Sequence, residues 1–461
     1  MKKYNIGIFH YIANFTDGVS LEMNKWKRVF EDMGHNVYLC AGEFGSADEV
    51  VIEEMYHHSP EAHLLSANTF KALIDYPNET VYRKEMFRLS DTIEKKLGKF
   101  VEDKQINLII PQNVWTVAAN PAVAIALTRV MRKYNLLALA HNHDFYFERT
   151  DGFSLTCGTA AEIADIYLPP RDPLAKHVVI NSLAQRQLFE RKGIPSAIVP
   201  NVFDFDTRPW ELDEYNRDFK EQVGLKENDI CVLQATRIVT RKGIELAIDF
   251  VQALNAPEQR TRLKELGLYD GRPFKDDSRI VLVLAGYAKD DGTGRYKSLL
   301  AQKAQAAGIE ALFIEDVVAE SREIRSGKKI YSLWDTYVHA DFVTYPSQWE
   351  GWGNQLLEAI RAKLPLLLFE YPVYQTDIKE KGLRVISLGS EISGRDQQGM
   401  VTVNPEIIQA AANQAVELLT DNSLRQNTIE HNFKVGKKHF SMDTLYIYLE
   451  QLLLSLETTW L

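Results

Sequence analysis

Residues 346–359 read Pro346-Ser347-Gln348-Trp349-Glu350-Gly351-Trp352-Gly353-Asn354-Gln355-Leu356-Leu357-Glu358-Ala359. The apolar run Asp341 to Tyr345 directly before them predicts a buried strand, and the residues after Gly353 predict a helix. A strand, a glycine-rich turn and a helix form the repeating unit of a parallel α/β sheet, in which ligands bind beside such turns. The pattern therefore predicts both a fold class and the place of a binding site.

Two glutamates flank this turn. Glu350 lies in the predicted loop and Glu358 about two turns into the predicted helix, so we expect both carboxylates on one side of it. The backbone amides between them lie near the positive end of the helix dipole, where anions are stabilised. Carboxylates that can bind sugar hydroxyls, beside amides that can bind an anion, suit a nucleotide-sugar. The turn residues predicted to contact it are Gly351, Trp352, Gly353 and Asn354.

A second charged cluster follows another predicted strand, Cys231 to Thr236. Arg237 and Lys242 lie between this strand and the predicted helix Ile244 to Leu254, and a glycine closes the segment. Arginine offers a planar fork of donors and lysine a point charge, so the two together suit a diphosphate. Arg241 is a weaker candidate that could simply face solvent.

The two motifs resemble those of the retaining glycosyltransferases of family four: R-x-x-x-x-K-G, followed downstream by P-S-x-x-E-G-x-G-x-x-x-x-E-A. The resemblance implies a B-type fold, in which two Rossmann-like, doubly wound α/β domains face each other across a cleft. It implies that Glu350 contacts the transferred sugar and Glu358 the ribose hydroxyls of the nucleotide. It also implies that Arg237 and Lys242 stabilise the leaving diphosphate without a metal or other cofactor, while that phosphate accepts the proton of the acceptor.

Length and composition agree with this class. A chain of 461 residues suits two α/β domains, and 45% apolar with 25% charged residues is typical of a soluble globular protein. No apolar run approaches the ~18–20 residues needed to span a bilayer. The three scattered cysteines form neither a disulfide framework nor a metal pair, so we expect a cytoplasmic protein. A net charge of −10 argues against nucleic acid or an anionic membrane as the partner.

Short apolar runs alternate with amphipathic segments along the chain, as in doubly wound parallel sheets. The strands expected in the first half are Ile6 to Tyr11, Val37 to Ala41, Leu108 to Pro111, Leu136 to Ala140, Val178 to Asn181 and Ala197 to Pro200. Those expected in the second half are Cys231 to Thr236, Ile280 to Ala285, Ala311 to Glu315, Asp341 to Tyr345, Pro365 to Phe369 and Val385 to Leu388. We predict an acceptor domain over residues 1–203 and a nucleotide-sugar domain over residues 204–438. By the resemblance, a terminal helix within residues 439–461 crosses back to the first domain.

The first domain supplies candidates after two of its strands. Asp17 and Gly18 open the helix after the first strand. A glycine there lets the loop approach phosphates or the acceptor, and a plain strand-to-helix turn is the alternative. His141, His143 and Asp144 follow the fourth strand and could form a zinc site, although a third suitably spaced ligand is lacking. By the resemblance, these three residues belong to the substrate site: His143 contacts the transferred sugar, and His141 is the second choice.

Three further segments were weighed. Phe145-Tyr146-Phe147-Glu148-Arg149 resembles a subgroup that makes small glycosylated solutes such as mannosylglucosylglycerate. Asp204-Phe205-Asp206 imitates the metal motif of another glycosyltransferase fold, but its place after the expected domain linker favours a turn. Residues 83–104 carry charges of both signs, which favours a solvated helix face over a lipid-docking one.

The predicted function is that of a retaining, metal-independent hexosyltransferase. It would move glucose or mannose from a nucleotide-diphosphate sugar, such as UDP-glucose or GDP-mannose, to a small soluble acceptor: a sugar, glyceric acid or a glycoside of it. Three alternatives remain open at this point. They are transfer to a membrane lipid, an epimerase or phosphorylase on the same fold, and a regulator that binds sugar nucleotides without catalysis.

Overall fold

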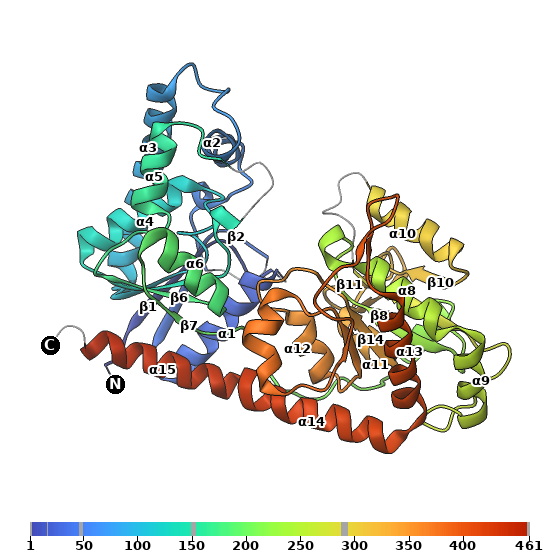
Figure 1. Ribbon diagram of the computed structural model, residues 1–461. Helices are drawn as coiled ribbons and strands as arrows, with labels where there is room; N and C mark the ends of the chain where they lie inside the picture. The colour runs from blue at the N-terminus through green and yellow to red at the C-terminus, as the bar shows by residue number, and fades with distance from the viewer. Residues whose placement is uncertain (1, 16, 46–48, 149–153, 287–293, 459–461) are drawn as a thin grey trace. The chain divides into compact units, whose positions relative to one another are not determined.

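The computed structural model describes residues 2–15, 17–45, 49–148, 154–286 and 294–458. The chain forms two compact units. Unit 1 comprises Met1–Val202 and Met442–Leu461, and unit 2 comprises Phe203–Ser441. Both are α/β units built on parallel sheets, as the sequence predicts (Figure 1).

Unit 1 is built on a seven-stranded sheet in the order β3-β2-β1-β4-β5-β6-β7, and all its strand pairs are parallel. Its strands are β1 (Asn5–Ala13), β2 (Asn36–Phe44), β3 (Val50–Val51), β4 (Leu108–Pro111), β5 (Leu137–Asn142), β6 (Ala175–Val179) and β7 (Ser196–Ile198). The six strands predicted for this half are confirmed, whereas two-residue β3 is too short for periodicity to reveal. The parallel order brings the carboxyl ends of β1, β4 and β5 next to one another.

Helices cover both faces of this sheet. They are α1 (Gly18–Asp32), α2 (Pro60–Phe70), α3 (Glu79–Lys104), α4 (Pro121–Tyr134), α5 (Gly158–Tyr167), α6 (Ser182–Lys192) and α15 (Met442–Thr458), with short turns η1 (Glu53–Met55) and η2 (Tyr146–Glu148). Leu108 and Ile110 pack in one core cluster with residues of α1 and α15, while Ile109 packs in another with residues of α3 and α4. The two clusters follow from the alternation of side chains along a strand.

The terminal helix α15 belongs to unit 1, although the chain reaches it from unit 2. Its apolar residues are spaced by three or four, so they form one face that packs in the same cluster as Trp26 and Phe30 of α1. The buried members of this face are Leu445, Leu449, Leu452, Leu453 and Leu456.

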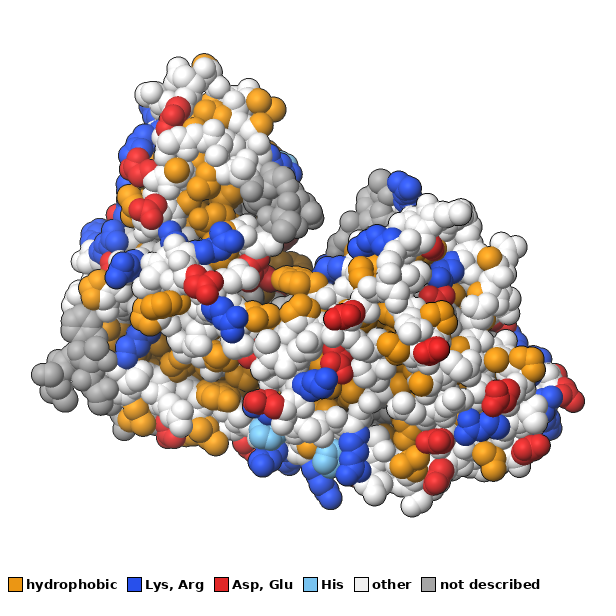
Figure 2. All heavy atoms as spheres, viewed as in Figure 1, with side chains coloured by type: hydrophobic (Ala, Val, Ile, Leu, Met, Phe, Trp, Pro, Cys, Tyr) orange, Lys and Arg blue, Asp and Glu red, His pale blue; other side chains and the backbone are white. Residues whose placement is uncertain are grey.

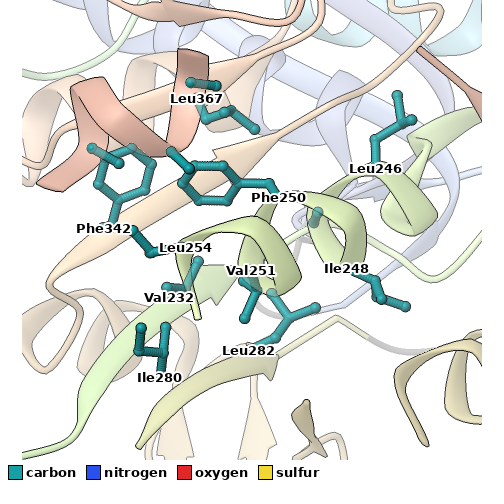
Figure 3. Close-up of a cluster of buried hydrophobic side chains, with 14 of the residues drawn as sticks. Val232, Leu246, Ile248, Phe250, Val251, Leu254, Ile280, Leu282, Phe342 and Leu367 are labelled. Atoms are coloured by element: carbon teal, nitrogen blue, oxygen red, sulfur yellow. The ribbon is translucent and has the colours of Figure 1, made fainter. Parts of the chain in front are cut away.

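Unit 2 is built on a six-stranded parallel sheet in the order β10-β9-β8-β14-β15-β16. Its strands are β8 (Ile230–Gln234), β9 (Ile280–Leu284), β10 (Glu310–Phe313), β14 (Phe342–Tyr345), β15 (Leu366–Leu368) and β16 (Ile386–Ser387). The helices and helical turns around it are α7 (Phe219–Gln222), η3 (Thr240–Lys242), α8 (Ile244–Leu254), α9 (Pro257–Leu266), α10 (Arg295–Ala306), α11 (Leu333–Val338), α12 (Asn354–Arg361), η4 (Tyr374–Ile378), η5 (Lys379–Lys381), α13 (Pro405–Thr420) and α14 (Asn422–Phe440). Apolar residues of α8 pack on the sheet, where the rings of Phe250 and Phe342 lie 5.5 Å apart (Figure 3). All six strands predicted for this half are present.

Two small sheets in unit 2 were not predicted. One contains β11 (Val318–Ala319), β12 (Glu323–Arg325) and β13 (Lys328–Ser332), and the other is the hairpin of β17 (Gly394–Arg395) and β18 (Val401–Thr402). All three residues of β12 are exposed, so this strand has no apolar run that could announce it.

Candidate active site

The two motifs of unit 2 meet because β14 pairs with β8 in the sheet. Parallel neighbours end at the same edge, so the loop after β8 and the loop after β14 lie side by side. The amide of Gln348 donates to the carbonyl oxygen of Arg241 at 2.9 Å and joins the loops directly.

The carboxylate of Glu350 pairs with two cations of the first motif. Its Oε1 accepts a hydrogen bond from Nζ of Lys242, and its Oε2 accepts one from Nη1 of Arg241 at 3.1 Å. Glu350 is 8% exposed and Lys242 is 7% exposed, so this is a buried ion pair. Burial raises the pKa of Glu350, but the charges of Lys242 and Arg241 outweigh that effect and leave the pKa below its usual value. Burial lowers the pKa of Lys242, and the charge of Glu350 opposes this shift.

Arg237 and Arg241 complete a group of three cations. Arg237 is exposed, and its charge lies close enough to lower the pKa of Lys242. Arg241 does not simply face solvent: besides Glu350 it donates to the carbonyl oxygen of Trp349 at 2.9 Å, and its guanidinium lies 5.6 Å from the centre of that ring. Three positive charges around one carboxylate leave a net positive site, which suits a diphosphate.

One glycine of each motif is required by backbone geometry. Gly353 has φ +123°, and a Cβ there would lie 2.2 Å from the hydroxyl oxygen of Tyr371. Gly243 has φ +58°, and its Cβ would lie 2.4 Å from the carbonyl oxygen of Pro346. Because neither glycine carries a Cβ, the two loops and the start of α12 can approach closely. This close approach positions Lys242 and Glu350.

The remaining predicted residues of this turn lie in different surroundings. Trp352 is 4% exposed, and its ring packs against Phe440 at 5.6 Å, so the side chain is part of the core. Gly351 and Asn354 are partly exposed at the amino end of α12.

Glu358 is the fifth residue of α12. It is therefore one turn into the helix rather than two, because the glycine turn continues to Gly353. Its Oε2 accepts a hydrogen bond of 2.8 Å from the hydroxyl of Tyr337, which is fully buried. Burial and the charge of Glu358 raise the pKa of Tyr337 well above its usual value, so the phenol stays a donor.

In unit 1, imidazole rings gather at the carboxyl ends of β1, β4 and β5. The side chain of His10 points to the residue after β4, and its Nδ1 lies 2.6 Å from the carbonyl oxygen of Gln112. His143 lies on the other side of the same residue, with Nε2 3.1 Å from Oε1 of Gln112. Burial lowers the pKa of His143 to about 3 and also lowers that of His10.

His141 lies deeper than His143. It is 1% exposed and stacks on Trp26, with ring centres 4.1 Å apart. Its ring centre also lies 4.2 Å from that of His143. The structure therefore places His141 beneath His143, in the core of unit 1.

Asn113 fixes the loop that carries His143 and Asp144. It has φ +56°, and its Oδ1 accepts from the backbone amides of His143 at 2.7 Å and Asp144 at 3.1 Å. Its Nδ2 lies 3.4 Å from Oδ2 of Asp144. The motif residue Arg149 lies outside the described residues.

Asp17 and Gly18 begin α1. Oδ1 of Asp17 accepts from the amides of Val19 at 3.0 Å and Ser20 at 3.1 Å, so it caps the helix. Gly18 is exposed as the first helical residue. Because the carboxylate of Asp17 already accepts hydrogen bonds from these amides, this end of α1 has fewer amides available to a phosphate than the sequence suggests.

Several residues at these two sites were missed from the sequence. They are His10, His57, Gln112 and Asn113 in unit 1 and Tyr337, Tyr345 and Tyr371 in unit 2. Tyr345 ends a predicted strand and His10 is the last residue but one of another, which is a signal that could have been used. The others become neighbours only through the fold.

Among the described residues, no group of three or more histidine, cysteine, aspartate or glutamate side chains is arranged to hold a metal ion. Within the same ranges no helix has the length and apolarity that crossing a bilayer demands. On the face shown in Figure 2, basic and acidic side chains are interspersed.

Comparison with known proteins agrees with the motifs. A family model described as glycosyl transferases group 1 matches residues 216–435, which contain both motifs of unit 2. Over 442 residues the chain is 38% identical to mannosylglucosylglycerate synthase of Thermotoga maritima, covering 95% of this chain and 97% of that protein. The protein of the same name from Petrotoga mobilis is 37% identical over 442 residues, with 95% and 98% covered. The chain belongs to the group 1 glycosyl transferase family.

A solved structure shares the two-unit fold. A crystal structure of Anabaena Alr3699/HepE in complex with UDP and glucose matches 98% of this chain and 100% of that chain, with a TM-score of 0.57 and 14% identity. At this identity the likeness shows the fold alone. This member of the family is therefore a glycosyltransferase with the two-unit α/β fold that the sequence predicts.

Proposed function

We propose that this glycosyltransferase moves glucose or mannose from a nucleotide-diphosphate sugar to a small soluble acceptor, with retention of anomeric configuration and without a metal ion. The observation that carries the proposal is the group of Arg237, Arg241 and Lys242 around the buried carboxylate of Glu350. The acceptor class, a sugar, glyceric acid or a glycoside of it, is supported by the name of the Thermotoga and Petrotoga relatives.

The cations of unit 2 would act on the leaving group. As the bond between the sugar carbon C1 and the diphosphate breaks, negative charge grows on the phosphate oxygen, and Arg237 and Lys242 stabilise it more than in the ground state. The acceptor oxygen bonds to C1 on the same face, and its proton passes to the departing phosphate oxygen. This route asks for no separate carboxylate base and no metal.

The two glutamates would hold the rest of the donor. Glu350 keeps Lys242 charged and in place before the donor arrives, and its carboxylate is proposed to bind a hydroxyl of the transferred sugar. Glu358, held by Tyr337 at 2.8 Å, is proposed to accept hydrogen bonds from the ribose hydroxyls. His143 and Asp144 of unit 1 are proposed to contact the sugar and the acceptor.

The test is a transfer assay with the full chain. UDP- and GDP-linked glucose and mannose are each incubated with a hexose, glyceric acid, a glucoside of glyceric acid or lipid vesicles. Products are identified by mass spectrometry and the new linkage by NMR. We expect transfer to a soluble acceptor, with an α-linkage formed from an α-linked donor.

Other outcomes of this assay point to other functions. Glycosylated lipid would mean a membrane acceptor, and donor conversion without any acceptor would mean an epimerase or phosphorylase. Binding of donor with no turnover at all would mean a regulator.

A further inference from the structure

We propose that unit 1 carries a site for the hydroxy-acid end of the acceptor, formed by His10, His57, Gln112 and Asp17. The site would bind a carboxylate through the two imidazoles and the Gln112 amide, and a neighbouring hydroxyl group through Asp17. This inference rests on the proposed function and selects one acceptor chemistry from those it leaves open.

Three segments of the chain bring these side chains together. His10 lies in the second half of β1, Gln112 follows β4, and His57 lies shortly after η1. The ring of His57 lies 5.4 Å from that of Tyr11, which is the neighbour of His10 in the chain, and Asp17 caps the helix after β1. The ring of Tyr11 also lies 5.1 Å from that of His10, and the charges of His10 and Asp17 both shift the pKa of His57.

The hydrogen bond of His10 defines the tautomer of its neutral ring. Its Nδ1 faces the carbonyl oxygen of Gln112, and a carbonyl can only accept, so Nδ1 carries a hydrogen. In the neutral ring Nε2 is therefore a bare acceptor that gains a hydrogen when the ring is protonated. A protonated His10 would offer this N–H to a ligand.

Three buried polar atoms of this cluster find no hydrogen-bond partner within the described part of the chain. They are Nε2 of Gln112, Nδ1 of His57 and Oδ2 of Asp17. Gln112 is fully buried, and buried polar groups in folded proteins are nearly always paired, so each of the three indicates a group that binds here. Two nitrogens that can donate and one oxygen that can only accept complement a carboxylate beside a hydroxyl group.

Proton uptake distinguishes an acid from a neutral polyol at this cluster. Burial lowers the pKa of His57 to about 4 and lowers that of His10, and the single charge of Asp17 reverses only part of this. His58 opposes protonation of His57, and Lys25 opposes that of His143 next to the cluster. A bound carboxylate supplies the missing negative charge, so its binding should be accompanied by proton uptake.

Isothermal titration with the full chain tests this site. The probes are a glucoside of glyceric acid, the matching neutral glucoside of glycerol, and a glucoside of lactic acid, which keeps the carboxylate but lacks the neighbouring hydroxyl. Each is titrated at about pH 6 and about pH 8 in two buffers with different heats of ionisation. At the lower pH we expect the glycerate probe to bind about ten-fold or more tighter than the neutral one, with proton uptake. The advantage should shrink at the higher pH, and the lactate probe should bind about three- to ten-fold more weakly than the glycerate probe.

Variants locate the effect. His10→Asn and His57→Gln should each reduce the preference for the acid and the proton uptake, whereas His63→Gln, on an exposed histidine of α2, should change neither. Equal binding of acid and neutral probes at both pH values, or binding without proton uptake, would overturn the site even if transfer itself is observed. Failure of transfer from every donor to every acceptor would instead overturn the proposed function.

Discussion

The carboxyl edges of the two sheets are built in opposite ways. In unit 2 the edge holds formal charges that satisfy one another: Lys242 and Arg241 share the carboxylate of Glu350. In unit 1 the edge holds imidazoles such as His10 and His143, whose pKa values burial lowers, beside buried polar atoms without partners in the described chain. The edge of unit 2 is held together by its own ion pairs, and we propose that the edge of unit 1 is completed by its ligand.

The difference follows from what each edge is proposed to bind. A diphosphate carries charge that only permanent cations can match, and a buried cation is stable only when a carboxylate accompanies it. A small acid carries a single charge, which neutral imidazoles can match by gaining a proton. Three substitutions and a change of pH test this difference between the two edges. The largest effect is expected in unit 2.

Replacing Lys242 by alanine should lower turnover about 10²–10³-fold, since it removes a cation proposed to act on the leaving diphosphate. Arg241 still pairs with Glu350, so the fold should persist. Turnover is measured at saturating donor, with circular dichroism as the check on folding. Lys264→Ala removes a lysine of the same unit that pairs with Asp276 at the surface, and it should leave turnover unchanged. If the two variants behave alike, the leaving-group role of Lys242 is wrong.

Replacing Gly353 by alanine tests how tightly the edge of unit 2 is packed. The new Cβ would lie 2.2 Å from the hydroxyl oxygen of Tyr371 at φ +123°, so we expect a loss of about 2–4 kcal/mol in the free energy of unfolding. Gly382→Ala is the matched control, because Gly382 has φ +81° with open space around it and should cost only about 1 kcal/mol. Denaturant titration of both variants measures the difference, and equal losses would mean that the turn tolerates displacement.

Lowering the pH should weaken unit 1 before unit 2. His143 and His177 are buried with pKa values of about 3 and about 4, because burial disfavours their charged forms. In the unfolded chain they titrate near 6.5, so stability is complete above that pH and falls as the pH drops towards the folded values. Each of these two histidines should lower the free energy of unfolding by about 2 kcal/mol when the pH falls from about 7 to about 5. The lowered pKa of Glu350 acts at lower pH, since its contribution is lost only below the ordinary carboxylate range.

Hydrogen exchange at the two pH values measures this difference unit by unit. Amides of β5 and β6 should lose more protection than those of β8 and β14. The variant His177→Asn should show a smaller pH dependence in unit 1. Equal loss in both units would contradict the expectation that the buried histidines of unit 1 outweigh His339 of unit 2, whose pKa burial also lowers.

The sequence carries the fold more completely than the sites. All twelve predicted strands exist because each is an apolar run between turns, while exposed β12 has no such signal. Lys242 and Glu350 were predicted in separate motifs, and they meet because β8 and β14 are neighbours. The same pairing brings Arg241 to Glu350, which spacing along the chain could not show.

The cluster of unit 1 shows the same limit. His10, His57 and Gln112 lie far apart in the chain and belong to no common motif. They meet only because β1 lies between β2 and β4 in the sheet. Asn113 is a further case, since its left-handed backbone and its bonds to the loop after β5 depend on that arrangement.

The smallest expected effect comes from Tyr337, whose hydroxyl holds Glu358 at 2.8 Å. Tyr337→Phe removes one buried hydrogen bond to a carboxylate and leaves the ring in place, so we expect about 1 kcal/mol, or about five-fold, in affinity for the nucleoside diphosphate. Turnover at saturating donor should hardly change, because this bond is proposed to position the ribose and not the reacting sugar. Tyr331→Phe is the control, since its hydroxyl binds Asp218 at 2.8 Å elsewhere in the unit. Calorimetric titration with the nucleoside diphosphate compares the two variants. A loss of turnover without a loss of affinity would place Glu358 in the chemical step. The residues at the edge of unit 2 would then act together on the reacting sugar, and the proposed division into phosphate, sugar and ribose contacts would be wrong.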